Sequence, residues 1–465
     1  MAIQQKKSTS FYVKWIVNFL IPIVIALIPT TDAFTAPIKW FLVISVFAII
    51  LIATENVPLL AVTIGLPVCY VVFLKVPATV AYQPWSLEIP WLILGGFILT
   101  VALQKSGLLQ RIAYRCILLF GGRFRGILYG MALVGTICSL IISDVAAKAI
   151  LLGALALGIC NALELKLGSR AASAVGMAAL ASALGPSYLF YTGSTGNLVP
   201  FGIAETAGVA VPTWGEYLVH MFIPQLIYVI LTVLVIDIFF KPDQTIQSKD
   251  YFKKELASFG KMKLDEKKIL GICLVLIVLI ATSSFHGVSI GWLFVFAAIV
   301  LMLPGFRLFQ PEEDVKKINF SFVLFVVTCL SIGVVSVHLG VGEFIANSLY
   351  SLLSDSLFKM IGGVWAMGFT VNFALTPLAA YSAFTAPIVD MAVASGINPV
   401  PVLYAFIHAL EQVVFPYEYA PVLIIYGYGM STFGRFAKYN IMRAVLSLVC
   451  IFAIFLPYWH LIGLL

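Results

Sequence analysis

The sequence predicts an all-α polytopic membrane protein with about eleven transmembrane helices and two re-entrant hairpins. Of the 465 residues, 62% are hydrophobic and only 11% are charged, whereas soluble domains carry about 25% charged residues. The apolar residues also recur in runs close to the roughly 20 residues that a helix needs to span a bilayer. A soluble protein of this composition could not cover its surface with polar groups, so the bilayer is the solvent that this chain requires.

The predicted transmembrane helices follow one another along the chain with short polar loops between them. Two longer apolar stretches, Leu128–Cys160 and Gly362–Val393, differ because each has a polar break near its middle, and we interpret them as re-entrant hairpins. The remaining apolar runs are the candidate spans: Trp15–Pro29, Ile38–Ala53, Pro58–Lys75, Pro90–Gln104, Arg170–Pro186, Trp214–Phe240, Lys268–Thr282, Ser289–Pro304, Phe320–Val337, Val400–Phe415 and Arg443–Leu465.

The positions of Lys and Arg predict the orientation of the chain. With the N-terminus in the cytoplasm, Lys105, Arg125, Lys166 and Arg170 all lie inside if Leu128–Cys160 enters and leaves by one face. The odd number of spans then puts the C-terminus outside, and we expect a multi-pass protein of the cell membrane, most simply a bacterial plasma membrane. The net charge of +7 belongs to these loops, so it does not indicate nucleic-acid binding.

An internal repeat relates the two halves of the chain. "SGLLQRIA" aligns with "LGVGEFIA", which pairs Gly107 with Gly340, and "SDVAAKA" aligns with "TPLAAYS", which pairs Ser143 with Thr376. Both matches have the same separation of 233 residues. In the predicted topology Gly107 lies inside and Gly340 outside, so the repeat is inverted. Inverted repeats are typical of secondary transporters whose substrate site lies near the bilayer midplane.

Four breaks interrupt the apolar runs, at the two hairpin tips and within Gly185–Pro200 and Phe415–Pro421. Irregular backbone at membrane depth is tolerated where it lines a protected cavity, and broken helices of this kind hold substrates in transporters. Proline kinks satisfied by neighbouring helices are the alternative. We favour a substrate site with no metal or cofactor, formed by Ser143, Asp144, Lys148, Ser194, Thr195, Asn197, Thr376, Pro377, Ser382 and His408.

Lys148 is the strongest candidate of this set. A charge at the centre of a membrane costs at least ~2.5 kcal/mol, so it indicates function. Lys148 follows Asp144 by one helical turn, and it either provides positive charge for an anionic substrate or forms a structural pair with Asp144. His408 is either a ligand contact or a hydrogen-bonded core histidine, and Ser382 can equally cap its own helix.

The chain resembles the divalent anion:sodium symporter family over nearly its whole length. The segment "LILGGFILTVALQKSGLLQRIA" (Leu92–Ala113) is similar to the fourth helix and amphipathic segment of that family. The resemblance implies transport of dicarboxylates, tricarboxylates or sulfate, with a Ser-Asn-Thr motif at each hairpin tip and two flanking sodium ions. Here the tips read Ser143-Asp144-Val145 and Thr376-Pro377-Leu378. Both asparagines are absent, which removes oxygen ligands that a sodium ion needs.

The chain therefore resembles the sodium-independent exchanger branch of the family, which includes 2-oxoglutarate/malate translocators. The resemblance implies antiport of 2-oxoglutarate, malate and succinate by an elevator-type homodimer. A fixed charge on Lys148 would make the empty carrier costly to move. A sodium- or proton-coupled symporter, in which Asp144 binds the cation, is the alternative. An intramembrane enzyme or a channel is less favoured, and no G-x-x-x-x-G-K-[ST] or H-E-x-x-H motif is present.

The same resemblance predicts the division of the chain into domains. Residues 1–127 form scaffold spans one to four with an amphipathic segment, and 128–240 form the first half of a transport domain. Residues 241–267 are a solvated cytoplasmic linker. Residues 268–361 return to the scaffold with spans seven to nine, and 362–465 complete the transport domain.

Overall fold

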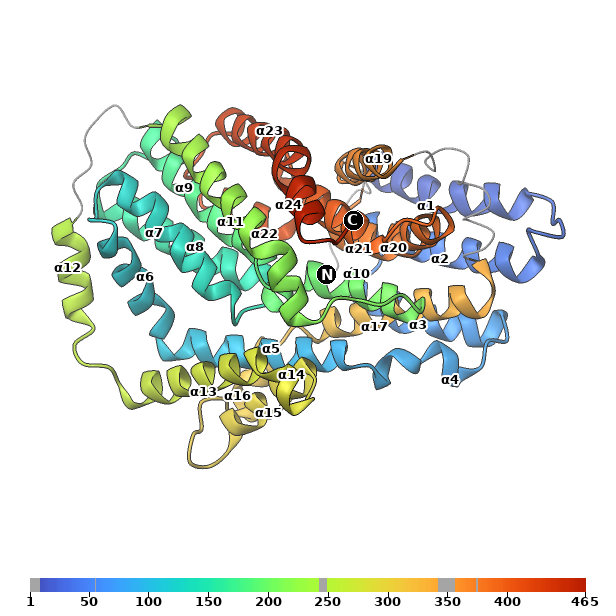
Figure 1. Cartoon of the computed structure of the whole chain (residues 1–465), viewed down its shortest axis with the longest axis horizontal. Helices are drawn as coiled ribbons and strands as arrows, with labels where there is room; N and C mark the ends of the chain where they lie inside the picture. Colours follow the sequence, from blue (N-terminus) through green and yellow to red (C-terminus); the bar gives the residue numbers. More distant parts are fainter. Residues whose placement is uncertain (1–8, 55, 242–248, 342–355, 374) are drawn as a thin grey trace, which may run out of the picture. The chain divides into compact units, whose positions relative to one another are not determined.

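Helices form all of the regular structure in the part of the chain that the computed structural model describes, which is residues 9–54, 56–241, 249–341, 356–373 and 375–465 (Figure 1). Among these residues, 6 helices are long and apolar enough to cross a membrane. They are α5 (Glu88–Ser106), α8 (Val145–Ala162), α11 (Trp214–Phe239), α17 (Phe320–His338), α20 (Pro377–Ala394) and the helix Phe433–Leu461, which comprises α23 (Phe433–Cys450), a π-helical turn and α24 (Leu456–Leu461).

Seven other α-helices in the described part of the chain overlap the remaining predicted spans. These are α1 (Thr9–Leu27), α2 (Ala36–Thr54), α3 (Leu59–Phe73), α9 (Arg170–Leu184), α13 (Leu264–Ala281), α15 (Ile290–Met302) and α21 (Pro399–Leu410). Each of the eleven predicted spans overlaps a helix of the structure. The helical fold class is therefore confirmed, whereas the number of membrane crossings stays a prediction.

The chain divides into two compact units, which we describe separately. Unit 1 contains Met1–Pro90, Val199–Val211 and Phe320–Leu403. Unit 2 contains Trp91–Leu198, Pro212–Asn319 and Tyr404–Leu465. The first predicted hairpin, Leu128–Cys160, thus belongs to unit 2 and the second, Gly362–Val393, to unit 1, a division that differs from the predicted scaffold and transport domains. Those functional roles stay predictions.

Unit 1 is built around α17, which packs on α3 and on the short helix α4 (Ala78–Ala81). Two buried hydroxyl groups on α17 connect these elements, because Thr328 Oγ1 donates to the Thr63 carbonyl at 2.8 Å and Ser331 Oγ donates to the Ala81 carbonyl at 2.7 Å. The hydrogen bonds of a buried polar group are strong in a water-free environment. They fix α17 against its neighbours within this unit.

Unit 2 contains α7 (Phe124–Ser139), α8, α9 and α11, which lie side by side in the blue-green to green part of Figure 1. Small residues allow the close approach of their backbones. A Cβ atom added to Gly135 on α7 would lie 2.0 Å from the carbonyl oxygen of Ser182 on α9. Every residue of α9 from Ala172 to Leu184 is buried. Close packing of small residues is the main way in which helices associate inside a membrane.

The predicted repeat is visible in the element boundaries. Helix α5 is followed by Gly107 at φ 79° and α17 by Gly340 at φ 71°, so each long helix ends at a left-handed glycine. Further along, α7 begins at Phe124 and α19 (Leu357–Val371) at Leu357, again 233 residues apart. Each is followed by a short break and a longer helix, α8 or α20. The two helix-break-helix units are therefore structural counterparts, and their predicted re-entry into the membrane stays a prediction.

The segment 241–267, predicted as a solvated linker, contains a docked helix. Helix α12 (Lys249–Ser258) buries Phe252 against Tyr114 of α6 (Leu108–Leu119), with the ring centroids 5.9 Å apart. Arg111 of α6 donates to the carbonyls of Phe259 and Gly260 at 3.1 and 2.8 Å and pairs with Glu266 at 2.9 Å. The sequence did not predict this helix, because a high density of charge concealed one apolar anchor, and the assignment of the segment as a cytoplasmic linker stays a prediction. Residues 242–248 lie outside the described residues.

Candidate functional site

The predicted tip of the first hairpin lies at the start of α8, where the side chain of Asp144 caps the helix. Asp144 precedes α8 as its N-cap, and its carboxylate accepts a hydrogen bond of 2.8 Å from the Ala146 N–H. Asp144 is therefore engaged with the helix start, where a negative charge is stabilised by the helix dipole. Asp144 and Lys148 interact electrostatically, but the ammonium of Lys148 hydrogen-bonds to other groups. The structural pair of Asp144 with Lys148, one of the two alternatives from the sequence, stays a prediction.

Lys148 joins three separate segments of unit 2. It lies one turn into α8 and is 0% exposed. Its ammonium donates to Ser139 Oγ at the end of α7 at 3.1 Å, to the Gly193 carbonyl at 2.7 Å, and to Ser187 Oγ. An ammonium group has three donors. All three are used here by neutral oxygens, and the carboxylates of Asp144 and Glu411 act on the positive charge through electrostatics without hydrogen bonds to it.

The first helix break supplies two of these oxygens. After α9 the chain continues as two 3₁₀ turns, Gly185–Tyr188 and Tyr191–Gly193, before α10 (Thr195–Thr206) begins. A Cβ on Gly193 would lie 2.6 Å from the Ser187 carbonyl oxygen and 2.9 Å from that of Ser139. Only glycine can stand there, and its close approach presents the Gly193 carbonyl to Lys148.

The other predicted residues of this break hold its irregular backbone. Asn197 Nδ2 donates to the carbonyls of Ser187 and Phe190 at 3.1 and 3.0 Å, and Ser194 Oγ accepts from the Gly196 N–H at 3.0 Å. The Thr195 N–H donates to the Ser143 carbonyl at 3.2 Å, which connects the break to the first tip. These contacts satisfy backbone groups that a membrane interior would otherwise leave without partners. Two buried oxygens, Ser143 Oγ and Asn197 Oδ1, lack hydrogen-bond partners among the described residues.

The second tip lies in unit 1, where its residues form a helix start of a different kind. Thr376 is the N-cap of α20 and accepts from the Ala379 N–H at 3.4 Å, and Pro377 follows as the first helical residue. Proline suits that position because no N–H is needed there. Ser382 Oγ donates to the Ala379 carbonyl at 2.8 Å, as expected for a serine that bonds to its own helix. The structure thus collects seven of the ten predicted site residues in unit 2 and places Thr376, Pro377 and Ser382 in unit 1.

His408 lies on α21 in the unit 2 interior. Its Nδ1 is 2.7 Å from Ser447 Oγ on α23, and its ring meets Tyr228 edge to face at a centroid distance of 4.6 Å. The description of a hydrogen-bonded core histidine therefore fits, although Nε2 has no hydrogen-bond partner in the described residues. Its role toward a substrate stays a prediction.

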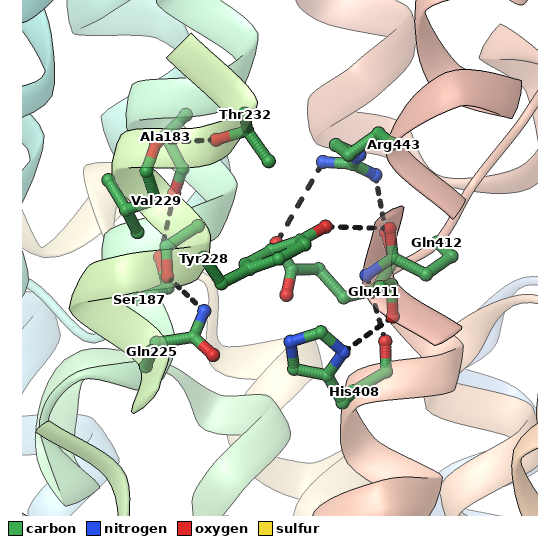
Figure 2. A network of polar contacts seen from close by, with 12 residues as sticks. Ala183, Ser187, Gln225, Tyr228, Val229, Thr232, His408, Glu411, Gln412 and Arg443 are labelled. Atoms are coloured by element: carbon green, nitrogen blue, oxygen red, sulfur yellow. Dashed lines mark hydrogen bonds and ion pairs between the residues drawn. The ribbon is translucent and has the colours of Figure 1, made fainter. Parts of the chain in front are cut away.

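Sequence reasoning missed two charged residues beside His408. Figure 2 shows Glu411, which follows α21, and Arg443 of α23 among Tyr228, His408 and Gln412. Glu411 and Arg443 are each 1% exposed. Arg443 Nη2 donates to the Glu411 carbonyl at 2.6 Å, while Nη1 lies 3.8 Å from Glu411 Oε1. The available signal is a charge within or beside an apolar run, because Glu411 lies in the predicted span Val400–Phe415 and Arg443 is the first residue of the span Arg443–Leu465.

The neighbouring Glu418 has a structural role. Its two carboxylate oxygens accept from the backbone N–H groups of Val414 and Phe415 at 3.0 and 2.9 Å, where they hold the start of the 3₁₀ turn Pro416–Glu418. Helix α22 (Ala420–Gly427) follows and packs on α8. The second helix break therefore belongs to the same packed body as the Lys148 helix.

Together these residues give unit 2 two fully buried cations, Lys148 and Arg443. Glu411 interacts electrostatically with both of them. Buried ionisable residues inside a polytopic helical protein mark substrate or ion pathways by default. Such an interior, next to broken helices, defines the class of the protein, an integral multi-pass membrane transporter.

Sequence comparison assigns the family within this class. A model described as the sodium:sulfate symporter transmembrane region matches residues 9–465, and the chain therefore belongs to that family. Dicarboxylate transporter 1 of spinach chloroplasts is 22% identical over 96% of this chain and 81% of its own length. All the relatives named here are membrane proteins or transporters, so the expectation of a transporter instead of an enzyme is confirmed.

Two bacterial relatives match over shorter regions. The inner membrane protein YbhI of Escherichia coli is 26% identical over 51% of this chain, and the sodium-dependent dicarboxylate transporter SdcS of Staphylococcus saprophyticus is 30% identical over 50%. The matches span 50% and 47% of those two proteins, about half of each.

Solved structures support the fold alone. MtrF of Neisseria gonorrhoeae, from a class of antimetabolite efflux pumps, has a TM-score of 0.56 at 12% identity and covers 94% of this chain and 97% of its own. The YdaH transporter of Alcanivorax borkumensis has a TM-score of 0.57 at 13% identity, with 92% and 99% covered.

Proposed function

We propose that the protein is a secondary active transporter that exchanges dicarboxylates such as 2-oxoglutarate, malate and succinate across a cell membrane without sodium. Its family membership and its similarity to a chloroplast dicarboxylate transporter over 96% of the chain support the substrate class. The similarity to SdcS, which is named as sodium-dependent, covers 50% of the chain. We infer the absence of sodium coupling from the residues of the site.

The observation that carries the proposal is the buried ammonium of Lys148. It is held between the first tip and the first helix break by neutral oxygens alone. An unpaired charge in a water-free interior is costly, and a bound anion lowers that cost. Because all three ammonium donors are engaged, we assign Lys148 a long-range electrostatic role, with hydrogen bonds to the substrate left to free groups such as Ser143 Oγ.

A permanent cation also favours exchange over symport. A carrier that binds sodium can release it and return uncharged, whereas Lys148 cannot leave. Movement of the empty site would carry a net charge through a medium of low dielectric constant, and the anion compensates that charge. The site would therefore cross the membrane mainly when it is loaded. The role of Asp144 as a helix cap disfavours the alternative in which this carboxylate binds the coupling cation.

We further propose an elevator-type homodimer, with the N-terminus in the cytoplasm and the C-terminus outside. The moving part would consist of residues 128–240 and 362–465, and the remaining spans would form the scaffold. The packing of α8 on α9 and α22, and of α11 on α23, supports the joint movement of segments from both halves of the chain within unit 2. Residues up to Leu403 of the second half belong to unit 1.

Reconstitution into liposomes tests the proposed function. With no sodium and no pH gradient, labelled succinate should enter rapidly only when an unlabelled dicarboxylate is trapped inside. Empty liposomes should show at least tenfold slower uptake. Uptake into empty liposomes that is driven by an inward sodium gradient would contradict the exchange mechanism and favour symport.

A further inference from the structure

Glu411 is a buried carboxylate that the proposed exchange does not use. Neither of its side-chain oxygens has a hydrogen-bond partner in the described part of the chain. The nearest cationic atom among the described residues, Arg443 Nη1, lies 3.8 Å from Oε1, at the limit of an ion pair. Buried carboxylates are normally hydrogen-bonded, because an ionised one costs several kcal/mol in a water-free environment. This arrangement therefore leaves one carboxylate oxygen open to a proton.

The guanidinium of Arg443 also has unused hydrogen-bond donors. Of its donors, Nη2 is used by the Glu411 backbone carbonyl, while Nε and Nη1 have no hydrogen-bond partner among the described residues. An arginine and a carboxylate that serve only as a structural pair normally close into a short, bidentate contact. Here the guanidinium is fixed by the backbone of Glu411 while the side chain of Glu411 is held apart (Figure 2). The guanidinium would thus remain in place whether the carboxylate is charged or neutral.

The surroundings of Glu411 contain a defined set of charged and titratable groups. Lys148 of α8 and Arg443 of α23 interact with it electrostatically. Tyr228 of α11 donates to Gln412 Oε1 at 2.9 Å, so its hydroxyl is engaged. Glu418 is held by two backbone N–H groups. Among the described residues, the groups that interact electrostatically with Glu411 are Lys148, Tyr228, Tyr439 and Arg443, while His408 and Glu418 interact with Arg443.

We propose that Glu411 is a proton-binding site whose occupancy is coupled to that of the substrate anion. This inference rests on the proposed function, because it requires a dicarboxylate to bind in unit 2. Protonation transfers one proton from solution to a Glu411 oxygen, where one O–H bond forms and no other bond changes. It removes one negative charge from the cluster around Lys148 and Arg443. The cluster then offers one more unit of uncompensated positive charge to an incoming dianion.

The coupling follows from charge repulsion. A dianion near Lys148 and Arg443 competes with the ionised Glu411 for the same two cations, so binding favours the protonated form of Glu411. By linkage, a proton on Glu411 must strengthen dianion binding by the same factor. The affinity for dicarboxylate should therefore increase as the pH falls, by up to tenfold per pH unit for one linked proton.

The experiment measures binding, not transport, on purified full-length protein in detergent. Succinate is titrated between pH 6.5 and 8.0, where its own carboxyl groups are ionised. Proton uptake is recorded with a pH indicator in weak buffer and by calorimetry in two buffers of different ionisation enthalpy. The wild type should take up a fraction of one proton for each succinate bound. Its Kd for succinate should decrease as the pH is lowered. Glu411→Gln should abolish the uptake and hold Kd constant within about threefold.

Three further variants complete the experiment. Glu313→Gln, at an exposed position, should behave as the wild type. If Glu411→Gln alone does not fold, the double variant Glu411→Gln/Arg443→Gln removes both charges and should show the same loss of uptake. His408→Asn is compared per succinate bound: proton uptake for each bound succinate should persist, whereas succinate binding without proton uptake would identify the histidine as the proton site and show that the proposal for Glu411 is wrong.

The outcomes separate this inference from the function on which it rests. Succinate binding without proton uptake in the wild type, or uptake that persists in Glu411→Gln, would overturn the role of Glu411 and leave the exchanger intact. The absence of binding by any dicarboxylate at every pH would instead overturn the proposed function, and the Glu411 proposal with it.

Discussion

At the scale of single residues, Lys148 contributes to the protein in two ways, through its positive charge and through the hydrogen bonds that connect three segments. The charge acts over several ångströms in a medium of low dielectric constant. The hydrogen bonds act only through Ser139, Ser187 and Gly193. Different substitutions remove the two contributions, so the proposed role of the charge can be tested on its own.

Lys148→Met should reduce dicarboxylate exchange by at least tenfold, because it removes the charge while it preserves most of the side-chain volume. Ser187→Ala keeps the charge and removes one acceptor, and it should reduce exchange by less than about threefold. Both variants should lower stability by roughly 1–3 kcal/mol, the cost of buried polar groups left without partners. Exchange in liposomes and thermal unfolding in detergent measure the two effects. Equal losses of exchange in the two variants would assign Lys148 a structural role. Lys166→Met, at an exposed loop position, is the control.

Asp314, the last residue of the short helix α16 (Pro311–Asp314), gives a pH-dependent prediction outside the predicted membrane spans. Burial tends to raise the pKa of this carboxyl, but hydrogen bonds from the Gln310 N–H, Lys317 and Lys105 outweigh it and lower the pKa to about 2. The ionised form is therefore stabilised in the folded protein, which adds stability above pH ~4 and loses it as the pH falls toward 2.

Asp314→Asn should thus be less stable than the wild type by ~1 kcal/mol at pH 7, a modest value because both lysines are partly exposed. The difference should be the same at pH 5 and should shrink by pH 3. Urea unfolding at the three pH values provides the measurement. A difference that grows as the pH falls would have the wrong sign.

At the scale of elements, the packing of α7 on α9 depends on the absence of a side chain. Gly135→Ala would place a methyl group 2.0 Å from the Ser182 carbonyl oxygen, on a backbone that cannot rotate away. We expect a loss of at least ~3 kcal/mol, or failure to fold, by comparison with overpacked cores.

The matched control lies on the adjacent helix. Gly158 of α8 would meet nothing within 4 Å, so Gly158→Ala should be neutral or stabilise the protein by up to about 1 kcal/mol through its helix propensity. Thermal unfolding in detergent measures both variants. Equal melting temperatures for the two alanine variants would show that the close contact of α7 and α9 does not constrain the fold.

The limits of sequence reasoning are also clearest at this scale. The glycine pair Gly107 and Gly340 and the matching starts of α7 and α19 could be predicted, because the repeat and the polar breaks are local signals. The partners of Lys148 could not, since they come from three segments that only the folded backbone brings together. Glu411 and Arg443 lie 32 residues apart on different elements, and no periodicity connects them. The anchored helix α12 depends on one apolar residue, Phe252, in a charged segment.

At the scale of the whole molecule, the exposed apolar side chains indicate the surface that faces lipid. On α11, exposed residues recur every three or four positions and form one face of the helix: Val219, Ile223, Ile227, Ile230, Leu234 and Ile238. The opposite face buries polar residues such as Gln225 and Thr232. This distribution is the reverse of a soluble amphipathic helix, as expected when the solvent is hydrocarbon.

The inverted repeat makes a prediction about sidedness. Ala162 and Ala394 are the last residues of the equivalent helices α8 and α20, and both are exposed. If the repeat is inverted, they lie on opposite sides of the membrane. A membrane-impermeant thiol reagent added to intact cells should label Ala394→Cys, and it should label Ala162→Cys only after permeabilisation. The native cysteines are replaced first. Labelling of both positions from the same side would contradict the inverted topology.

The fully enclosed helix α9 has a consequence for how this protein can diversify. Because neighbours surround it on every side, almost any larger residue between Ala172 and Leu184 would meet an occupied space. In a saturation mutagenesis library selected for growth on a transported nutrient, this stretch should tolerate few replacements, whereas the outward face of α11 should accept many. Changes in cargo preference among natural variants should accordingly arise at its flanks, where the chain leaves the helix.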